Sequence, residues 1–191
     1  MIETTELRFK TSEIRVAPGR SGQPTAIRGY AAVFNSISED LGGFTEKISP
    51  GAFRSAIAVG KEILALMHHD VKQIIGRRSA GTLSVAEDTR GLSFEIYPGD
   101  TTAGRDAVEM VRRGDIRGAS FRFSNAVSTW DYATTGKVRT ISSIGELMEI
   151  TLTGIPAYLA TTASLMEFSE PRSTPRRDYA RRRLQLAAME L

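Results

Sequence analysis

The chain of 191 residues contains no cysteine and only two histidines. Without cysteine it cannot form disulfide bonds, and it has neither a thiol nucleophile nor a thiolate metal ligand. The two histidines, His68 and His69, are adjacent, and a zinc site would need further ligands at favourable spacing. Glycine-rich loops of the kinds that hold nucleotide phosphates are also missing. We therefore expect no metal ion and no organic cofactor.

Long hydrophobic runs are absent as well. No stretch of about 18 apolar residues, the length that spans a bilayer, occurs in the sequence. Residues 1–16 lack the apolar segment of a secretory signal. We therefore expect neither a signal peptide nor contact with a membrane.

The excess of positive charge is confined to the C-terminal end of the chain. The formal net charge is +3, and the six arginines and two acidic residues of residues 171–191 contribute +4, which leaves −1 for residues 1–170. A chain of this length forms one domain with its own core. We therefore expect a folded domain over residues 1–167 and a basic tail, helical or disordered, over residues 168–191. A tail that binds a partner explains this division better than a nucleic-acid-binding domain does, so nucleic acid is not the expected partner.

Alternating apolar and polar residues predict that most of the domain consists of β-strands. The predicted strands span residues 6–16, 27–34, 63–67, 74–76, 82–86, 92–97, 116–127 and 139–153. We expect the first two to form a hairpin, and residues 130–136 to form a loop. The order of elements favours a mainly β fold with flanking helices, in the form of an antiparallel barrel or sandwich.

Two helices are predicted by their terminal residues. In the first, Ser49 is placed to cap the free amides and Pro50 occupies the first helical position. The second begins at Asp100 or Thr101 and ends at Gly114, after a stripe of small apolar residues. We expect both helices to pack outside the sheets.

One serine has an unusual setting. Ser120 follows Gly118 and Ala119, whose side chains are too small to shield it, and it opens a strand-like run. This setting is typical either of a structural serine at a strand start or of a nucleophile held at a bare position. Arg122 stands where the nucleophile elbow of α/β-hydrolases requires a second glycine, so that class of enzyme is disfavoured.

A serine nucleophile needs a general base, and histidine is the side chain that titrates near neutral pH. The base must then be His68 or His69, and because neighbouring side chains of a strand point to opposite faces, only one of them can face a given site. The orienting acid could be Asp70, Glu146 or Glu149. A solvent-exposed histidine–aspartate turn without any catalytic role is the alternative.

Glu149 is the most unusual of these acids, because it lies within an apolar strand, where an unpaired charge is costly. It either accepts a hydrogen bond from a partner there, or it faces solvent together with Leu147 and Thr151 in simple alternation. Both interpretations remain open at this point.

Read together and in order, several motifs resemble the prohead, or capsid maturation, protease family of tailed phages. The resemblance covers about residues 27–165. It rests on GYAAVFN (29–35), DLGGFTE (40–46), PGAF (50–53), HD (69–70), IGR (75–77), GTL (81–83), RGDI (113–116), SF (120–121), LMEIT (147–151) and PAY (156–158). The fold that it implies is a β-barrel surrounded by helices, related to the herpesvirus assemblin serine proteases.

By position, the resemblance implies that Ser120 is the nucleophile, His69 the general base and Glu149 the third member of a triad. The family usually has an asparagine before the catalytic histidine, where this chain has His68. His68 therefore stays the alternative base, and Asp70 stays the alternative acid.

The residues around Ser120 would serve the substrate. Gly118 and Ala119 leave room for a substrate strand to approach, and backbone amides near Ser120 would bind the oxyanion. Arg122 either touches the oxyanion or the substrate, or lies on the outer face.

The resemblance also implies the biological setting. A serine endopeptidase of this family cleaves capsid and scaffold proteins inside the immature phage prohead, in the cytoplasm of the bacterial host. Analogy with the herpesvirus enzymes suggests a homodimer, and residues 170–178 offer an accessible place for self-cleavage. The rival function is a non-catalytic capsid-assembly or scaffolding protein on the same fold.

Overall fold

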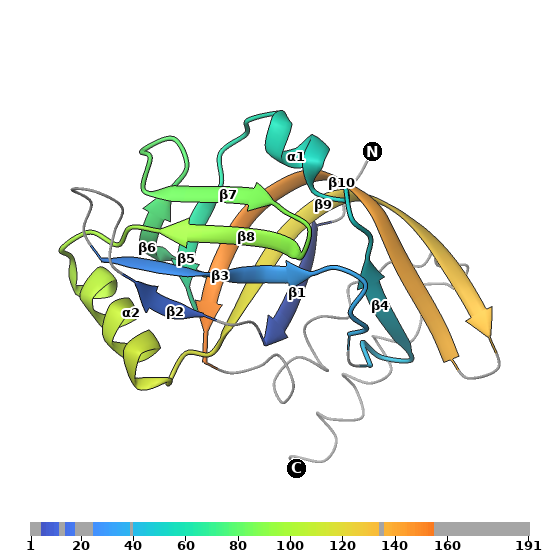
Figure 1. Ribbon diagram of the computed structural model, residues 1–191, viewed down its shortest axis with the longest axis horizontal. Helices are drawn as coiled ribbons and strands as arrows, with labels where there is room; N and C mark the ends of the chain where they lie inside the picture. The colour runs from blue at the N-terminus through green and yellow to red at the C-terminus, as the bar shows by residue number, and fades with distance from the viewer. Residues whose placement is uncertain (1–4, 12–13, 18–24, 39, 134–135, 155–191) are drawn as a thin grey trace, which may run out of the picture.

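The computed structural model describes residues 5–11, 14–17, 25–38, 40–133 and 136–154, and these form two β-sheets with two short helices (Figure 1). The predicted basic tail over residues 168–191, which was expected to be helical or disordered, lies outside the described residues.

The larger sheet has the strand order β1-β9-β10-β5-β6, and one further strand, β4, pairs with β10. Its strands are β1 (Thr5–Thr11), β4 (Phe44–Ile48), β5 (Leu64–Met67), β6 (Asp70–Arg77), β9 (Gly118–Ala133) and β10 (Gly136–Thr153). The smaller sheet has the order β2-β3-β8-β7. Its strands are β2 (Arg15–Ala17), β3 (Ala26–Val33), β7 (Leu83–Glu87) and β8 (Gly91–Ile96). The helices are α1 (Arg54–Ala58) and α2 (Thr102–Arg113).

The expected mainly β architecture is confirmed, with two qualifications. The pairings between described residues give two open sheets and do not close a barrel. In addition, the sheet is not purely antiparallel: β10 pairs antiparallel with β9 but in parallel with β4 and β5.

The hydrophobic core lies between the two sheets, whose strands cross one another in Figure 1. From the larger sheet it takes Phe121, Phe123, Leu147, Ile150 and Leu152, and from the smaller sheet Ile27, Leu92, Phe94 and Ile96. Phe53, just before α1, packs edge-on against Phe121 with ring centroids 5.4 Å apart. Alternate residues of these strands therefore point away from the core, onto two outer faces.

The predicted first hairpin is confirmed in part, because β2 pairs antiparallel with β3, but residues 6–16 do not form one strand. β1 pairs with β9 in the larger sheet, whereas β2 pairs with β3 in the smaller one. The predicted loop over residues 130–136 is wrong, since β9 continues to Ala133. There Trp130 packs against Phe44 of β4, with ring centroids 5.1 Å apart.

The start of the first helix is misplaced by the sequence pattern. Ser49 does not cap α1, whose N-cap residue is Phe53 and has no side-chain cap. Gly51 has φ +93°, which interrupts a helical path, and the Glu87 carboxylate accepts hydrogen bonds from the amides of Gly51 and Phe53.

The structure confirms the second predicted helix, α2, including both of its ends. The Thr101 hydroxyl accepts a hydrogen bond from the amide of Gly104, and Gly114 ends α2 in the left-handed conformation, with φ 80°.

Candidate active site

The two histidines occupy the turn between β5 and β6, where the chain reverses within two residues. Met67 pairs with Asp70, and His68 and His69 have positive φ angles of 51° and 60°. Positive φ at both central positions is the geometry of a type I′ hairpin turn, which asparagine and glycine favour. The amide of His68 donates to the carbonyl of Leu152 at 3.0 Å, which fixes the turn against β10. The expectation that the histidines alternate along a strand is therefore wrong.

A β-bulge determines which way Glu149 points. Leu147 pairs with Phe123, but Glu149 pairs with Arg122, so Met148 is an extra residue in β10. Leu147 consequently faces the core, and Glu149 faces the opposite side together with Thr151. Simple alternation, which places Leu147 and Glu149 on one solvent-facing side, is wrong. The Glu149 side chain is only 6% exposed.

Three side chains contact the Glu149 carboxylate. His69 Nδ1 lies 2.5 Å from Glu149 Oε1, and the Thr151 hydroxyl donates to the same oxygen at 3.0 Å. Arg122 Nε lies 3.5 Å from Oε2. Burial alone raises the pKa of Glu149, but the hydrogen bond with His69, the charge of Arg122 and the hydroxyl of Thr151 outweigh it, so this pKa lies below its ordinary value. The carboxylate is therefore ionised and held in one orientation.

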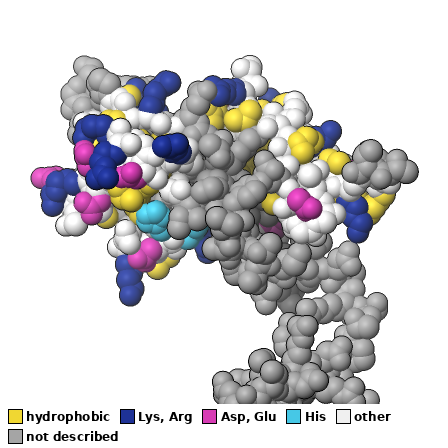
Figure 2. Space-filling view, turned by 90° about the horizontal axis from the view of Figure 1, so that it is seen from below, with side chains coloured by type: hydrophobic (Ala, Val, Ile, Leu, Met, Phe, Trp, Pro, Cys, Tyr) yellow, Lys and Arg dark blue, Asp and Glu magenta, His cyan; other side chains and the backbone are white. Residues whose placement is uncertain are grey.

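Ser120 lies one strand away from Glu149, on the same outer face. Cross-strand partners in an antiparallel pair project to the same side, and Ser120 is paired with Thr151 while Arg122 is paired with Glu149. The structure thus brings His69 and Glu149 into contact and adds Ser120 to the same face. Figure 2 shows that histidine side chains reach the molecular surface.

The expected bareness of Ser120 is wrong, since the residue is only 1% exposed. Ser120 lies on an inner strand of the sheet, paired with Phe9 of β1 on one side and with Thr151 of β10 on the other. Gly118 and Ala119 are paired with the same two strands, so their small side chains do not open a path along the sheet. The backbone amides near Ser120, which were expected to bind the oxyanion, belong to residues of this three-stranded ladder.

The other candidate acids have partners of their own. The Asp70 carboxylate accepts hydrogen bonds from the amide of Lys72 at 2.9 Å and from Gln73 at 3.1 Å. The bond from Lys72 is the main reason why the pKa of Asp70 is lowered. Glu146 forms an ion pair with Lys61 at 3.0 Å. Asp70 therefore stabilises the turn.

Thr151 is the site residue to which sequence reasoning gave no role. The alternation pattern already placed it on the face of Glu149, and a hydroxyl two residues from a buried carboxylate is a natural donor to it. That signal was available in LMEIT (147–151).

The described part of the chain contains no cluster of three or more histidine, cysteine or acidic side chains that could hold a metal ion. Among the same residues, no helix is long and apolar enough to cross a membrane.

Comparison with known families assigns the chain. A family model described as caudovirus prohead serine protease matches residues 10–173, which include Ser120, His69 and Glu149. The chain belongs to the caudovirus prohead serine protease family. It is thus a serine protease of phage capsid maturation, as the ordered motifs predicted. No curated protein and no solved structure matches the chain significantly.

Proposed function

We propose that the protein is a serine endopeptidase that cleaves phage capsid and scaffold proteins inside the immature prohead, in the host cytoplasm, through a triad of Ser120, His69 and Glu149. The assignment of these three residues rests on one observation. His69 Nδ1 contacts a buried carboxylate, Glu149, on the face of the sheet that also carries Ser120. An imidazole oriented in this way by an acid is the arrangement that activates a serine hydroxyl.

In the proposed mechanism, His69 Nε2 removes the proton of the Ser120 hydroxyl while Oγ attacks the scissile carbonyl carbon. The tetrahedral intermediate collapses when His69 delivers that proton to the leaving amine, and water then hydrolyses the acyl-enzyme by the same route. Glu149 accepts a hydrogen bond from the Nδ1–H group of His69, which fixes the tautomer and stabilises the imidazolium that forms.

Two further side chains complete the proposal. Thr151 is a positioning residue, because its hydroxyl fixes the Glu149 oxygen that faces His69. Arg122 is partly exposed and lies beside Glu149 on the same face, so we assign it to stabilisation of the oxyanion or to the substrate.

The burial of Ser120 favours the second candidate function, a non-catalytic capsid-assembly protein on the same fold. At 1% exposure the Ser120 hydroxyl is not accessible to a peptide. The protease function therefore requires that the protein opens around Ser120 before substrate binds.

The deciding experiment compares two serine substitutions on one face of β9. Ser120→Ala should reduce cleavage of co-expressed capsid protein by at least about 10³-fold, as expected for loss of a nucleophile. Ser124→Ala is the matched control, because Ser124 lies four residues further along the strand and is fully buried, and its hydroxyl has no hydrogen-bond partner among the described residues. It should process capsid protein normally. Unchanged cleavage by the Ser120→Ala protein would establish the non-catalytic alternative for this site.

We further propose that the protease trims itself within residues 170–178 and that it forms a homodimer. The basic composition of the tail equally supports a role in binding an acidic surface of the assembly. Intact mass of the native and Ser120→Ala proteins separates these roles, because self-cleavage shortens only the native chain. Sedimentation of the same samples measures the oligomeric state.

A further inference from the structure

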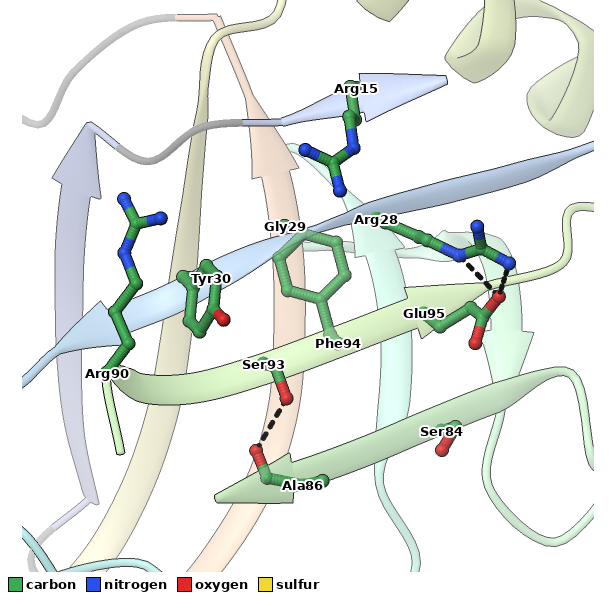
Figure 3. A pocket seen from close by; sticks show the side chains of 10 residues that line it. All are labelled: Arg15, Arg28, Gly29, Tyr30, Ser84, Ala86, Arg90, Ser93, Phe94 and Glu95. Atoms are coloured by element: carbon green, nitrogen blue, oxygen red, sulfur yellow. Dashed lines mark hydrogen bonds and ion pairs between the residues drawn. The ribbon is translucent and has the colours of Figure 1, made fainter. Parts of the chain in front are cut away.

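A pocket of about 330 Å³ lies on the outer face of the smaller sheet (Figure 3). Two rows of side chains cross this face. Arg15 of β2 is paired with Arg28 of β3, which is paired with Glu95 of β8. In the next row Tyr30 is paired with Ser93.

The side chains that line the pocket carry more positive than negative charge, and a second carboxylate, Asp88, lies beside Tyr30 and Arg90. Three arginines, Arg15, Arg28 and Arg90, line it, against one carboxylate, Glu95. Glu95 accepts a hydrogen bond from Arg28 Nε at 2.5 Å and forms an ion pair with the same guanidinium, so Arg28 largely neutralises it. Arg15 and Arg90 are exposed, and they stand on different sides of the pocket in Figure 3.

The walls suit a short peptide. The Arg90 guanidinium lies 4.7 Å from the centre of the Tyr30 ring, so an aromatic face and a cation are presented together. The Tyr30 hydroxyl donates to Asp88 at 2.7 Å, which keeps the ring in place. Guanidinium groups match the two oxygens of a carboxylate, and a volume of this size holds a few side chains.

We propose that this pocket binds an acidic segment of a protein partner. A nucleic acid is disfavoured because residues 1–170 carry a net charge of −1, so the domain has no extended positive field to attract a polyanion. The inner faces of both sheets meet in the core, so the pocket and Ser120 lie on opposite outer faces. A segment bound here is therefore a docking segment and cannot be the one that is cut. Binding does not depend on the catalytic role proposed for Ser120.

The test is fluorescence anisotropy with full-length protein carrying Ser120→Ala, so that cleavage does not affect the reading. The probes are a short glutamate-rich peptide, its glutamine counterpart, a single-stranded oligonucleotide of equal charge and, as competitor, inorganic phosphate. The protein should bind the acidic peptide and not its glutamine counterpart.

The variants locate the binding. Arg15→Gln with Arg90→Gln should weaken binding of the acidic peptide about tenfold at low salt, since it removes two charge pairs with the ligand. The matched control is Arg105→Gln with Arg112→Gln, which removes the same charge from α2, where the two side chains are 61% and 59% exposed. It should change the affinity by less than about twofold. Ser84→Glu adds a negative charge beside Glu95 without removing an arginine, and it should also weaken binding.

Two outcomes would overturn the proposal. The first is equal loss of affinity in the two double variants, which would assign the binding to general electrostatic attraction, including that of the basic tail. The second is binding of the oligonucleotide or of phosphate that depends on Arg15 and Arg90 as strongly as binding of the acidic peptide does.

Discussion

At the scale of single residues, the Glu149 carboxylate is the centre on which the other site residues converge. His69 and Thr151 share its Oε1 atom, and Arg122 lies near Oε2. A carboxylate held by three partners cannot rotate freely, so the imidazole that it contacts is oriented as well. Two changes can be measured separately: removal of one hydrogen-bond donor to this carboxylate, and removal of its charge.

Replacing Thr151 with valine should impair catalysis without unfolding the protein. Valine keeps the shape of the side chain but removes the donor to Glu149, so we expect kcat/KM to fall about tenfold. The pKa of Glu149 should rise, because the Thr151 hydroxyl is one of the groups that lower it. Carboxyl NMR titration measures that pKa, and Thr151→Ser should restore both quantities. A Thr151→Val protein with native kinetics and an unchanged Glu149 titration would remove Thr151 from the positioning role.

Neutralising Glu149 should change how stability depends on pH. The pKa of Glu149 in the folded protein is lower than its ordinary value of 4.5. The ionised carboxylate therefore contributes its full stability above that value, and the contribution is lost as the pH falls through the folded-state pKa. In urea unfolding between pH 7 and about pH 3, the gap in free energy of unfolding between the native and Glu149→Gln proteins should shrink on the acid side of 4.5. Glu109→Gln, which removes a carboxylate that is 54% exposed on α2, is the control for the loss of a surface charge. A gap for Glu149→Gln that widens in acid would contradict the stabilising role of the ionised carboxylate.

At the scale of elements, the features that are local in sequence were predictable and those set by pairing were not. α2 was predictable because its cap at Thr101 and its stop at Gly114 lie within one short stretch. The separation of residues 6–16 into β1 and β2 was not, since β2 pairs with the next strand, β3, whereas β1 pairs with β9, which is distant in sequence. The alternation pattern also did not predict the bulge at Met148. One extra residue there moves the side chains that precede it in β10 to the opposite face of the sheet.

The turn between β5 and β6 distinguishes the two histidines experimentally. His68 has φ 51°, a conformation that asparagine adopts at lower cost than histidine does. His68→Asn should therefore raise the free energy of unfolding by roughly 0.5–1 kcal/mol and leave cleavage of capsid protein intact. His69→Asn occupies the neighbouring position, where φ is 60°, and should abolish cleavage while the protein remains folded. Urea unfolding and capsid-protein processing measure the two effects. Loss of cleavage on substitution of His68 alone would transfer the role of base to that residue.

At the scale of the whole molecule, the two sheets divide the proposed functions between their outer faces. The candidate triad lies on the larger sheet and the arginine pocket on the smaller one, with the core between them. The ordered motifs predicted the family and indicated the residues of the candidate triad, because the resemblance assigns residues by their position in those motifs. They could not predict that Ser120 is only 1% exposed, since the exposure of a residue depends on its neighbours in the folded chain and not on its neighbours in sequence.

The covered serine leads to a prediction about opening. If catalysis requires the structure to open around Ser120, a fluorophosphonate that acylates nucleophilic serines should label the isolated native protein slowly. Urea well below the unfolding midpoint should accelerate labelling, because it favours conformations that expose more surface. Mass spectrometry of the labelled peptide measures the rate. Ser120→Ala protein should not be labelled at this peptide, and Ser124→Ala protein should be labelled like the native one. Rapid labelling of Ser120 without urea would contradict the closed state, since a residue that is 1% exposed cannot react at the rate of an open active site.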